Sequence, residues 1–149
     1  MDALVIGTAD ELTAAVTRGL ERQGRSVLQA LPADADGPER IDWLLDEAGR
    51  PPLVVVFDDQ PYATAHALLT HTHAEVVLVA QYRVGAAGAP HSAPSPWPIG
   101  RGLKVVMLGR AGRRWFTLGP RKMKTLSAER AAALVVRACR LPAPERRAA

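Results

Sequence analysis

The sequence predicts an α/β protein, a three-layer sandwich whose sheet is mostly parallel and has about five to six strands. Apolar segments of strand length alternate along the chain with segments whose apolar residues recur at helical spacing. Most of the apolar segments lack polar alternation, which is typical of strands covered by helices on both faces. With 149 residues, of which 48% are hydrophobic, the chain is long enough to bury this core as one domain.

Short apolar runs bounded by polar residues, Gly or Pro are predicted to form the parallel sheet. They are 3–7, 26–31, 52–57, 75–80 and 103–108. The segment 113–119 is a sixth candidate strand. Because parallel strands need crossover connections, helices are expected between them.

Segments with helical spacing of apolar residues are predicted to be these helices. They are 10–23, 38–49, 62–73 and 127–141. Asp10 or Thr8 is expected to cap the first helix, Gly24 to end it, and Ser127 to cap the last.

One face of the second helix is predicted to pack on the sheet, because Ile41, Leu44 and Leu45 share that face. Trp43 and Trp115 are predicted to occupy core or groove positions.

The chain is predicted to be one domain over residues 1–141, followed by a flexible tail at 142–149. Within it, residues 85–102 are rich in Pro and Gly and are predicted to form a loop or lid. Cys139, the single cysteine, lies in an apolar run and is expected to be buried. The start of the chain lacks a signal-peptide pattern and no apolar run is long enough to span a membrane, so we expect a cytoplasmic protein.

Charge is divided sharply along the sequence. Residues 1–75 contain 13 acidic and 5 basic side chains, whereas residues 76–128 contain 9 basic and no acidic ones. Either the two halves neutralise each other, across the fold or across a homodimer interface, or the second half binds an anionic ligand or partner. Nucleic acid is disfavoured, because aromatic and basic residues combine only at 110–116 and there is no recognition-helix motif.

The stretch 4–27 resembles the first strand, turn and helix of the short-chain dehydrogenases/reductases, whose turn has the form T-G-x-x-x-G-x-G. Ile6 and Gly7 take the first two places of that motif, and Glu11 and Thr13 replace its other two glycines. The resemblance implies a Rossmann-like fold with NAD or NADP as the cofactor. It assigns cofactor-binding positions to Gly7, Thr8, Glu11, Thr13 and Asp34.

Three further segments resemble the same family. Residues 31–49 are similar to its acidic strand end and next helix, with Asp34 where an Asp typically touches the adenine. The strand that ends in Asp58 and Asp59 is similar to the family strand that ends in Asn-Asn-Ala-Gly, and residues 123–145 resemble a late helix. However, the chain is much shorter than usual members, and it lacks their Tyr-x-x-x-Lys: Tyr62 is followed four residues later by His66. The Glu11 carboxylate also repels a pyrophosphate at the helix start, so a truncated member without redox chemistry or a cofactor is predicted.

The predicted function is therefore non-redox binding of a small anionic ligand or an acidic protein partner by Arg110, Arg113 and Arg114, at the carboxyl ends of the strands. One alternative is an NAD(P)-dependent oxidoreductase; another is a cofactor-free isomerase or cyclase with an aspartate base. The candidate catalytic residues are Asp58, Asp59 and Tyr62. No metal site is predicted, although histidines gather near the end of the third helix.

Overall fold

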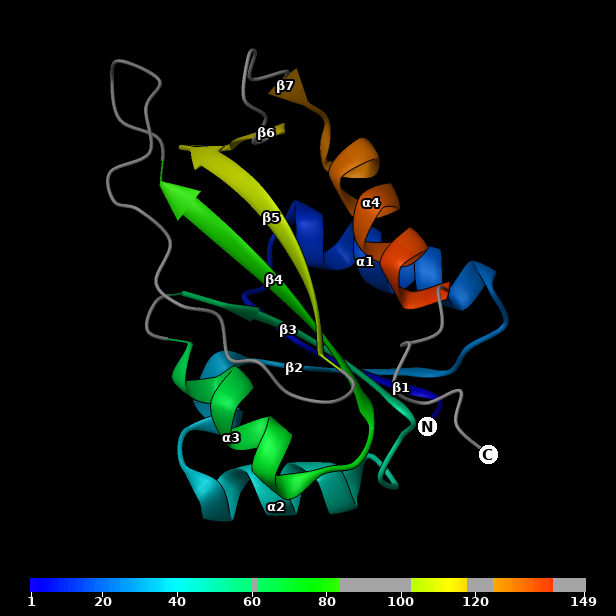
Figure 1. Cartoon of the computed structure of the whole chain (residues 1–149). Helices are drawn as coiled ribbons and strands as arrows, with labels where there is room; N and C mark the ends of the chain where they lie inside the picture. The colour runs from blue at the N-terminus through cyan, green and yellow to red at the C-terminus, as the bar shows by residue number, and fades with distance from the viewer. Residues whose placement is uncertain (60–61, 84–102, 118–124, 141–149) are drawn as a thin grey trace.

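The computed structural model describes residues 1–59, 62–83, 103–117 and 125–140 (Figure 1). Its strands are β1 (Ala3–Ile6), β2 (Val27–Ala30), β3 (Leu53–Asp58), β4 (Glu75–Arg83), β5 (Leu103–Ala111), β6 (Arg114–Thr117) and β7 (Thr125–Leu126). Its helices are α1 (Glu11–Arg22), α2 (Pro38–Glu47), α3 (Ala63–His71) and α4 (Ala128–Arg140), and a 3-10 turn, η1, covers Pro32–Ala35.

All seven strands form one sheet in the order β2-β1-β3-β4-β5-β6-β7. The first five in this order are parallel, and β6 and β7 are antiparallel to their neighbours. Although β1 and β3 are neighbours, the chain visits β2 on the far side of β1 between them. The sheet is therefore doubly wound, with its switch point between β1 and β3.

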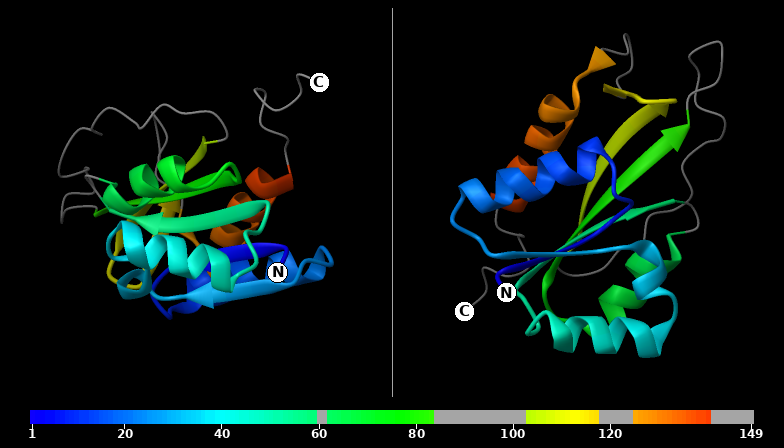
Figure 2. Two further views of the ribbon diagram at one scale, coloured as in Figure 1. Left: turned by 90° about the horizontal axis from the view of Figure 1, so that it is seen from below. Right: turned by 180° about the vertical axis from the view of Figure 1, so that it is seen from behind.

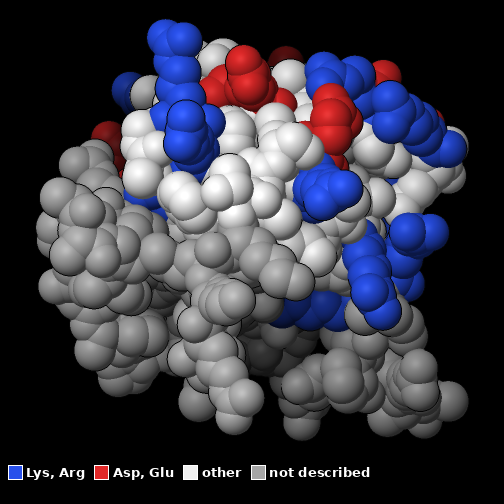
Figure 3. All heavy atoms as spheres, turned by 90° about the horizontal axis from the view of Figure 1, so that it is seen from above, with Lys and Arg blue, Asp and Glu red and all other residues white. Residues whose placement is uncertain are grey.

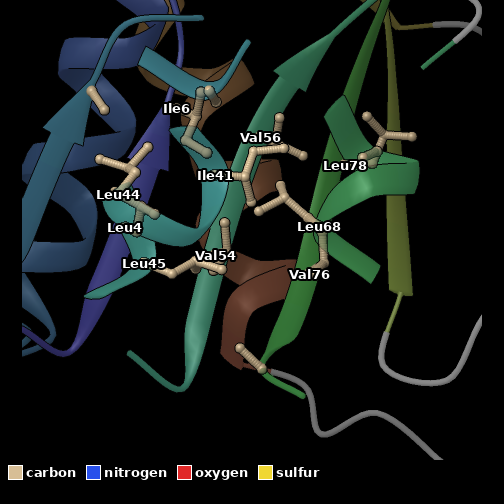
Figure 4. Packing of buried hydrophobic residues seen from close by; sticks show 14 of the residues in the cluster. Leu4, Ile6, Ile41, Leu44, Leu45, Val54, Val56, Leu68, Val76 and Leu78 are labelled. Carbon is tan, nitrogen blue, oxygen red and sulfur yellow. The ribbon is translucent and has the colours of Figure 1, made fainter. Parts of the chain in front are cut away.

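Helices cover both faces of the sheet (Figures 1 and 2). One face packs against α2 and α3, where Ile41, Leu45 and Leu68 point toward Val54 and Val56 of β3 (Figure 4). The opposite face packs against α1 and α4 in a second buried cluster. Because β3 is covered on both sides, its residues alternate between the two clusters, which explains its uniformly apolar sequence.

The structure confirms an α/β fold with a mostly parallel sheet, and this arrangement is compatible with a Rossmann-like fold. The expected number of strands was wrong: the described residues form seven, not five or six. The additional strand, β7, has only two residues and pairs with β6 alone, so it carries no apolar pattern of its own. β4 also continues to Arg83, three residues beyond its expected end.

Local signals at the helix ends are confirmed. The Thr13 N–H donates to Asp10 Oδ1 (2.9 Å), so Asp10 rather than Thr8 caps α1. Gly24 follows that helix with φ 84°, a left-handed conformation that glycine adopts without strain. At α4, the Arg130 N–H donates to Ser127 Oγ (3.2 Å), as expected for an N-cap.

The two described tryptophans differ in burial. Trp115 is 4% exposed in the α1/α4 cluster, as predicted, whereas Trp43 is 63% exposed on α2. The prediction for Trp43 was wrong because the buried face of α2 is a single stripe formed by Ile41, Leu44 and Leu45. At about 100° per residue, position 43 points about 200° away from Ile41.

Two predicted segments, the loop or lid at 85–102 and the tail at 142–149, lie outside the described residues. Among the helices that the structure describes, none has the length and apolar character needed to cross a membrane.

Cys139 is 3% exposed, and burial raises the pKa of its thiol from 9.0 to about 12. The thiolate is the reactive form of cysteine. Raising the pKa from 9.0 to about 12 lowers the thiolate population at pH 8 by about a thousandfold. We expect the folded protein to react with a thiol-specific disulfide reagent about a thousandfold more slowly than the guanidinium-unfolded chain. Rapid stoichiometric labelling of the folded protein would contradict a structural role for this thiol.

Candidate functional site

The carboxyl ends of β1 and β3 meet at the switch point of the sheet, where doubly wound folds bind ligands. The β1–α1 turn contributes Gly7, Thr8 and Asp10 to this edge, and the end of β3 contributes Asp58 and Asp59. The sequence-based expectation that strand ends gather polar residues here agrees with this geometry.

Gly7 is closely surrounded by side chains. A Cβ at this position would lie 2.8 Å from Phe57 Cδ2 and 3.0 Å from Thr13 Oγ1, both closer than a relaxed contact. Thr13 is itself fully buried under the turn. Gly7 and Thr13, both in the expected cofactor-binding set, are therefore buried beneath the turn. Thr8 and Glu11, from the same set, are exposed.

Asp34, the remaining residue of that set, lies in η1 just beyond the carboxyl end of β2. It is exposed, and its Oδ2 accepts the Leu31 N–H (3.1 Å). Asp34 therefore closes the 3-10 turn while its side chain remains accessible at the edge of the sheet.

Arg110, near the end of β5, is held by several groups. Its Nη1 donates to Gln81 Oε1 (3.0 Å) on β4 and lies 3.4 Å from Asp10 Oδ2, and its Nε donates to the Gly112 carbonyl (3.0 Å). Its Cζ lies 5.6 Å from the centroid of the Trp115 ring, within the range of a cation–π contact. Asp10 thus caps α1 with one oxygen and pairs with Arg110 through the other.

Sequence reasoning missed Asp10 and Gln81 as members of this site. Gln81 follows the apolar run of β4, so reading that strand three residues further would have indicated a polar side chain at the carboxyl end. The pairing of Asp10 with Arg110 joins residues 100 positions apart and has no local signal.

Arg113 and Arg114 are exposed at the β5–β6 hairpin, beside the same end of the sheet. The two central residues of the hairpin turn are Gly112 and Arg113, and Gly112 has φ 61°, which suits the first position of a type II′ turn. Among the described residues, neither arginine forms an ion pair with a carboxylate. Viewed from the side where β6, β7 and α4 lie in Figure 1, the described surface carries more Lys and Arg than Asp and Glu (Figure 3).

Some of the basic side chains in residues 76–128 form ion pairs within the fold. Lys104 forms an ion pair with Glu75, and each side chain is 16% exposed. Together with the Arg110–Asp10 pair, this contact supports the interpretation that the two halves partly neutralise each other across the fold. Arg101, Arg121, Lys122 and Lys124 lie outside the described residues.

Asp58 ends β3 and caps α3. Its Oδ1 accepts the Asp59 N–H and its Oδ2 accepts the Ala65 N–H, both at 3.0 Å. Burial raises the pKa of the Asp58 carboxyl above 3.8, although the N–H donors, including that of Thr64, oppose this shift. Asp59 is exposed beside it.

Tyr62 precedes α3 with φ 60° and ψ 41°, a left-handed conformation that is unusual for a tyrosine. It is 2% exposed and belongs to the α2/α3 core cluster, whereas His66, one turn further, is exposed. The structure therefore places Tyr62 in the core, with its N–H donating to the Asp59 carbonyl (2.7 Å), and not with His66 on an open helix face.

Two hollows among the described residues lie away from the carboxyl ends. One of about 350 Å³ lies between α1 and α4, and one of about 320 Å³ lies near the start of β3. The second is lined by His71 and His73, and His71 Nδ1 is 3.0 Å from Asp42 Oδ1. Within the described ranges, no group of three His, Cys, Asp or Glu side chains is placed to hold a metal ion.

The fold and the site define a class: a doubly wound α/β protein with polar and cationic side chains at the carboxyl ends of its strands. No family model, curated protein or solved structure matches this chain.

Proposed function

We propose that this chain is a non-redox binding or accessory protein, built like a compact short-chain dehydrogenase/reductase, which holds a small anionic ligand or an acidic protein partner. The observation that carries this proposal is the exposure of Arg113 and Arg114 beside the carboxyl ends of the strands, without carboxylate partners among the described residues. Arg110 already has partners there, so its role in the proposal is to shape the site next to the two exposed arginines.

The start of α1 supports a function without a dinucleotide. In Rossmann-like sites the pyrophosphate sits at this helix N-terminus. Here the Asp10 carboxylate already accepts the Thr13 N–H, and Glu11 adds a second negative charge in the first turn. A pyrophosphate would have to displace the first carboxylate and approach the second.

Replacing both Arg113 and Arg114 with alanine should weaken binding of an acidic probe while leaving the melting temperature nearly unchanged, because exposed charges contribute little to stability. With pyrophosphate and a polyglutamate peptide as probes, we expect about a tenfold loss of affinity at low salt. The difference should disappear at high salt because the charges are then screened. Titration calorimetry across a salt series measures both effects.

The matched control replaces Arg22 and Arg140 with alanine, which removes the same charge from the α1/α4 side. It should bind the probes as the wild type does. Equal weakening by both double variants would mean that the probes respond to net charge alone, and the proposed site would be wrong.

A saturable thermal shift of several degrees with NAD or NADP would favour the oxidoreductase alternative instead.

A second candidate function is a cofactor-free isomerase or cyclase with Asp58 as its base. The observation that favours it is the raised pKa of this carboxyl at the switch point, since a base near neutral pH needs a raised pKa. Loss of a non-redox turnover in Asp58→Asn, with the fold intact, would support this function over binding alone.

The raised pKa of Asp58 also predicts a pH dependence of stability. Because burial favours the protonated acid in the folded state, the contribution of Asp58 to stability is present at low pH and lost as the pH rises through its raised pKa. Relative to Asp58→Asn, the wild type should therefore lose free energy of unfolding as the pH rises from below 3.8 toward neutral. Urea unfolding at a series of pH values measures this slope.

Asp59→Asn is the companion variant, because the Asp59 charge contributes to raising the pKa of Asp58. In the Asp59→Asn background, the loss of free energy of unfolding with rising pH that is assigned to Asp58 should become smaller. A slope of the opposite sign would mean that the N–H donors outweigh burial, and Asp58 would then be a helix cap without the properties of a base.

A further inference from the structure

The outer surfaces on the two sides of the sheet carry opposite charge. The α2 surface with η1 contains two arginines, Arg40 and Arg50, and six carboxylates: Asp34, Asp36, Glu39, Asp42, Asp46 and Glu47. The α1 and α4 helices with the turn after α1 contain three glutamates and six arginines: Arg18, Arg22, Arg25, Arg130, Arg137 and Arg140. These two surfaces lie on opposite sides of the sheet (Figure 1).

An exposed tryptophan lies at the centre of the acidic surface. Trp43 is 63% exposed on α2, with Glu39 four residues before it and Glu47 four residues after it. Residues four apart lie on the same side of a helix, so the three side chains form one stripe about 12 Å long. Within the described part of the chain neither glutamate has an ion pair, whereas Asp46 is already bound to Arg50.

A matching stripe lies on the basic surface. Leu134 is 40% exposed on α4, with Arg130 four residues before it and Arg137 three residues after it. This stripe is about 10 Å long by the same helical rise. Trp43 and Leu134 therefore each lie between two charges of one sign, and the sign is opposite on the two helices. Arg40, three residues before Trp43, is a basic neighbour of the acidic stripe, and its guanidinium donates to the Ala33 carbonyl of η1 (2.9 Å).

We propose that two copies of this chain associate head to tail, with the Glu39–Trp43–Glu47 stripe of one copy docking on the Arg130–Leu134–Arg137 stripe of a second copy. The docked Trp43 packs on Leu134, the glutamates pair with the arginines, and an arginine stacks on the indole ring. Because each copy carries both stripes on opposite sides, the contact is heterologous and leaves one stripe free at each end of the assembly. A contact made by two short helices is small, so the association is weak and sensitive to salt.

Charge reversal tests this contact by complementation. Glu39→Lys/Glu47→Lys removes the acidic stripe and Arg130→Glu/Arg137→Glu removes the basic one, and all four side chains are exposed. In sedimentation velocity at low salt, the average mass of the wild type should rise with concentration without a plateau at the dimer. Each variant alone should remain monomeric at concentrations at least tenfold higher, and an equimolar mixture should associate, because one intact pair of stripes remains between the two variants.

Two further variants separate this contact from a general effect of charge. Glu47→Lys and Glu21→Lys change the net charge equally, but only the first lies on the acidic stripe, so the second should associate at least as strongly as the wild type. Trp43→Ala should weaken association about tenfold with no change of charge.

A wild type that stays monomeric at millimolar concentration, a plateau at the dimer, or a mixture that fails to associate would each overturn the proposal. Binding of pyrophosphate to the Arg113 and Arg114 surface is measured separately and does not depend on this result.

Discussion

Removing the Glu75 carboxylate should lower the free energy of unfolding by about 2–3 kcal/mol. Glu75 begins β4 and forms an ion pair with Lys104 of β5, and both side chains are 16% exposed. In Glu75→Ala the Lys104 ammonium loses its counter-charge but stays largely buried, where it still donates to the Ala138 carbonyl of α4 (2.8 Å). The loss is large because an uncompensated buried charge costs more than the pair contributes.

A double-mutant cycle with Lys104→Met, followed by urea unfolding, measures this coupling. Glu75→Leu and Lys104→Met should each be destabilised alone, and the double variant Glu75→Leu/Lys104→Met should recover most of the loss because no charge remains buried. If Glu75→Ala costs less than about 0.5 kcal/mol, the pair is hydrated like a surface pair. Lys104 would then be accessible to an anionic ligand, in contrast to its structural role here.

Replacing Gly19 with alanine should destabilise the protein by about 1–2 kcal/mol, although alanine is the better helix former. Gly19 lies where α1 packs against α4, and a Cβ there would be 2.6 Å from Val136 Cγ2. In an exposed helix the same change would stabilise by about 1 kcal/mol. Here the overlap forces the two helices apart, and this packing loss exceeds the gain in propensity.

Val136→Ala provides the matched rescue, because it removes the methyl groups that the new Cβ would meet. The double variant Gly19→Ala/Val136→Ala should be more stable than the sum of the two single effects predicts, as measured by thermal and urea unfolding. Additive effects, or a stabilised Gly19→Ala, would show that the α1/α4 contact adjusts without loss.

Sequence patterns of short range predicted much of the architecture. β3 was predicted because a strand covered on both faces must be apolar throughout, and Val54, Val55 and Val56 are fully buried. The caps at Asp10 and Ser127 were predicted because a capping side chain bonds a backbone N–H only three residues away. The positions of Asp58 and Arg110 near the carboxyl ends of β3 and β5 followed from the same strand predictions.

The bonding partners of the candidate site residues were decided by tertiary structure alone. Arg110 reached Asp10 and Gln81 only because the strand order brings β5 beside β4 and α1 over the same face of the sheet. Sequence analysis could count Arg110 as a basic residue, but it could not show that a carboxylate 100 residues away already binds it. Local conformation depends on interactions within a few residues, and so the sequence alone determined the elements and their ends. Which charges are neutralised and which remain exposed depends on contacts between distant segments, which only the folded chain brings together.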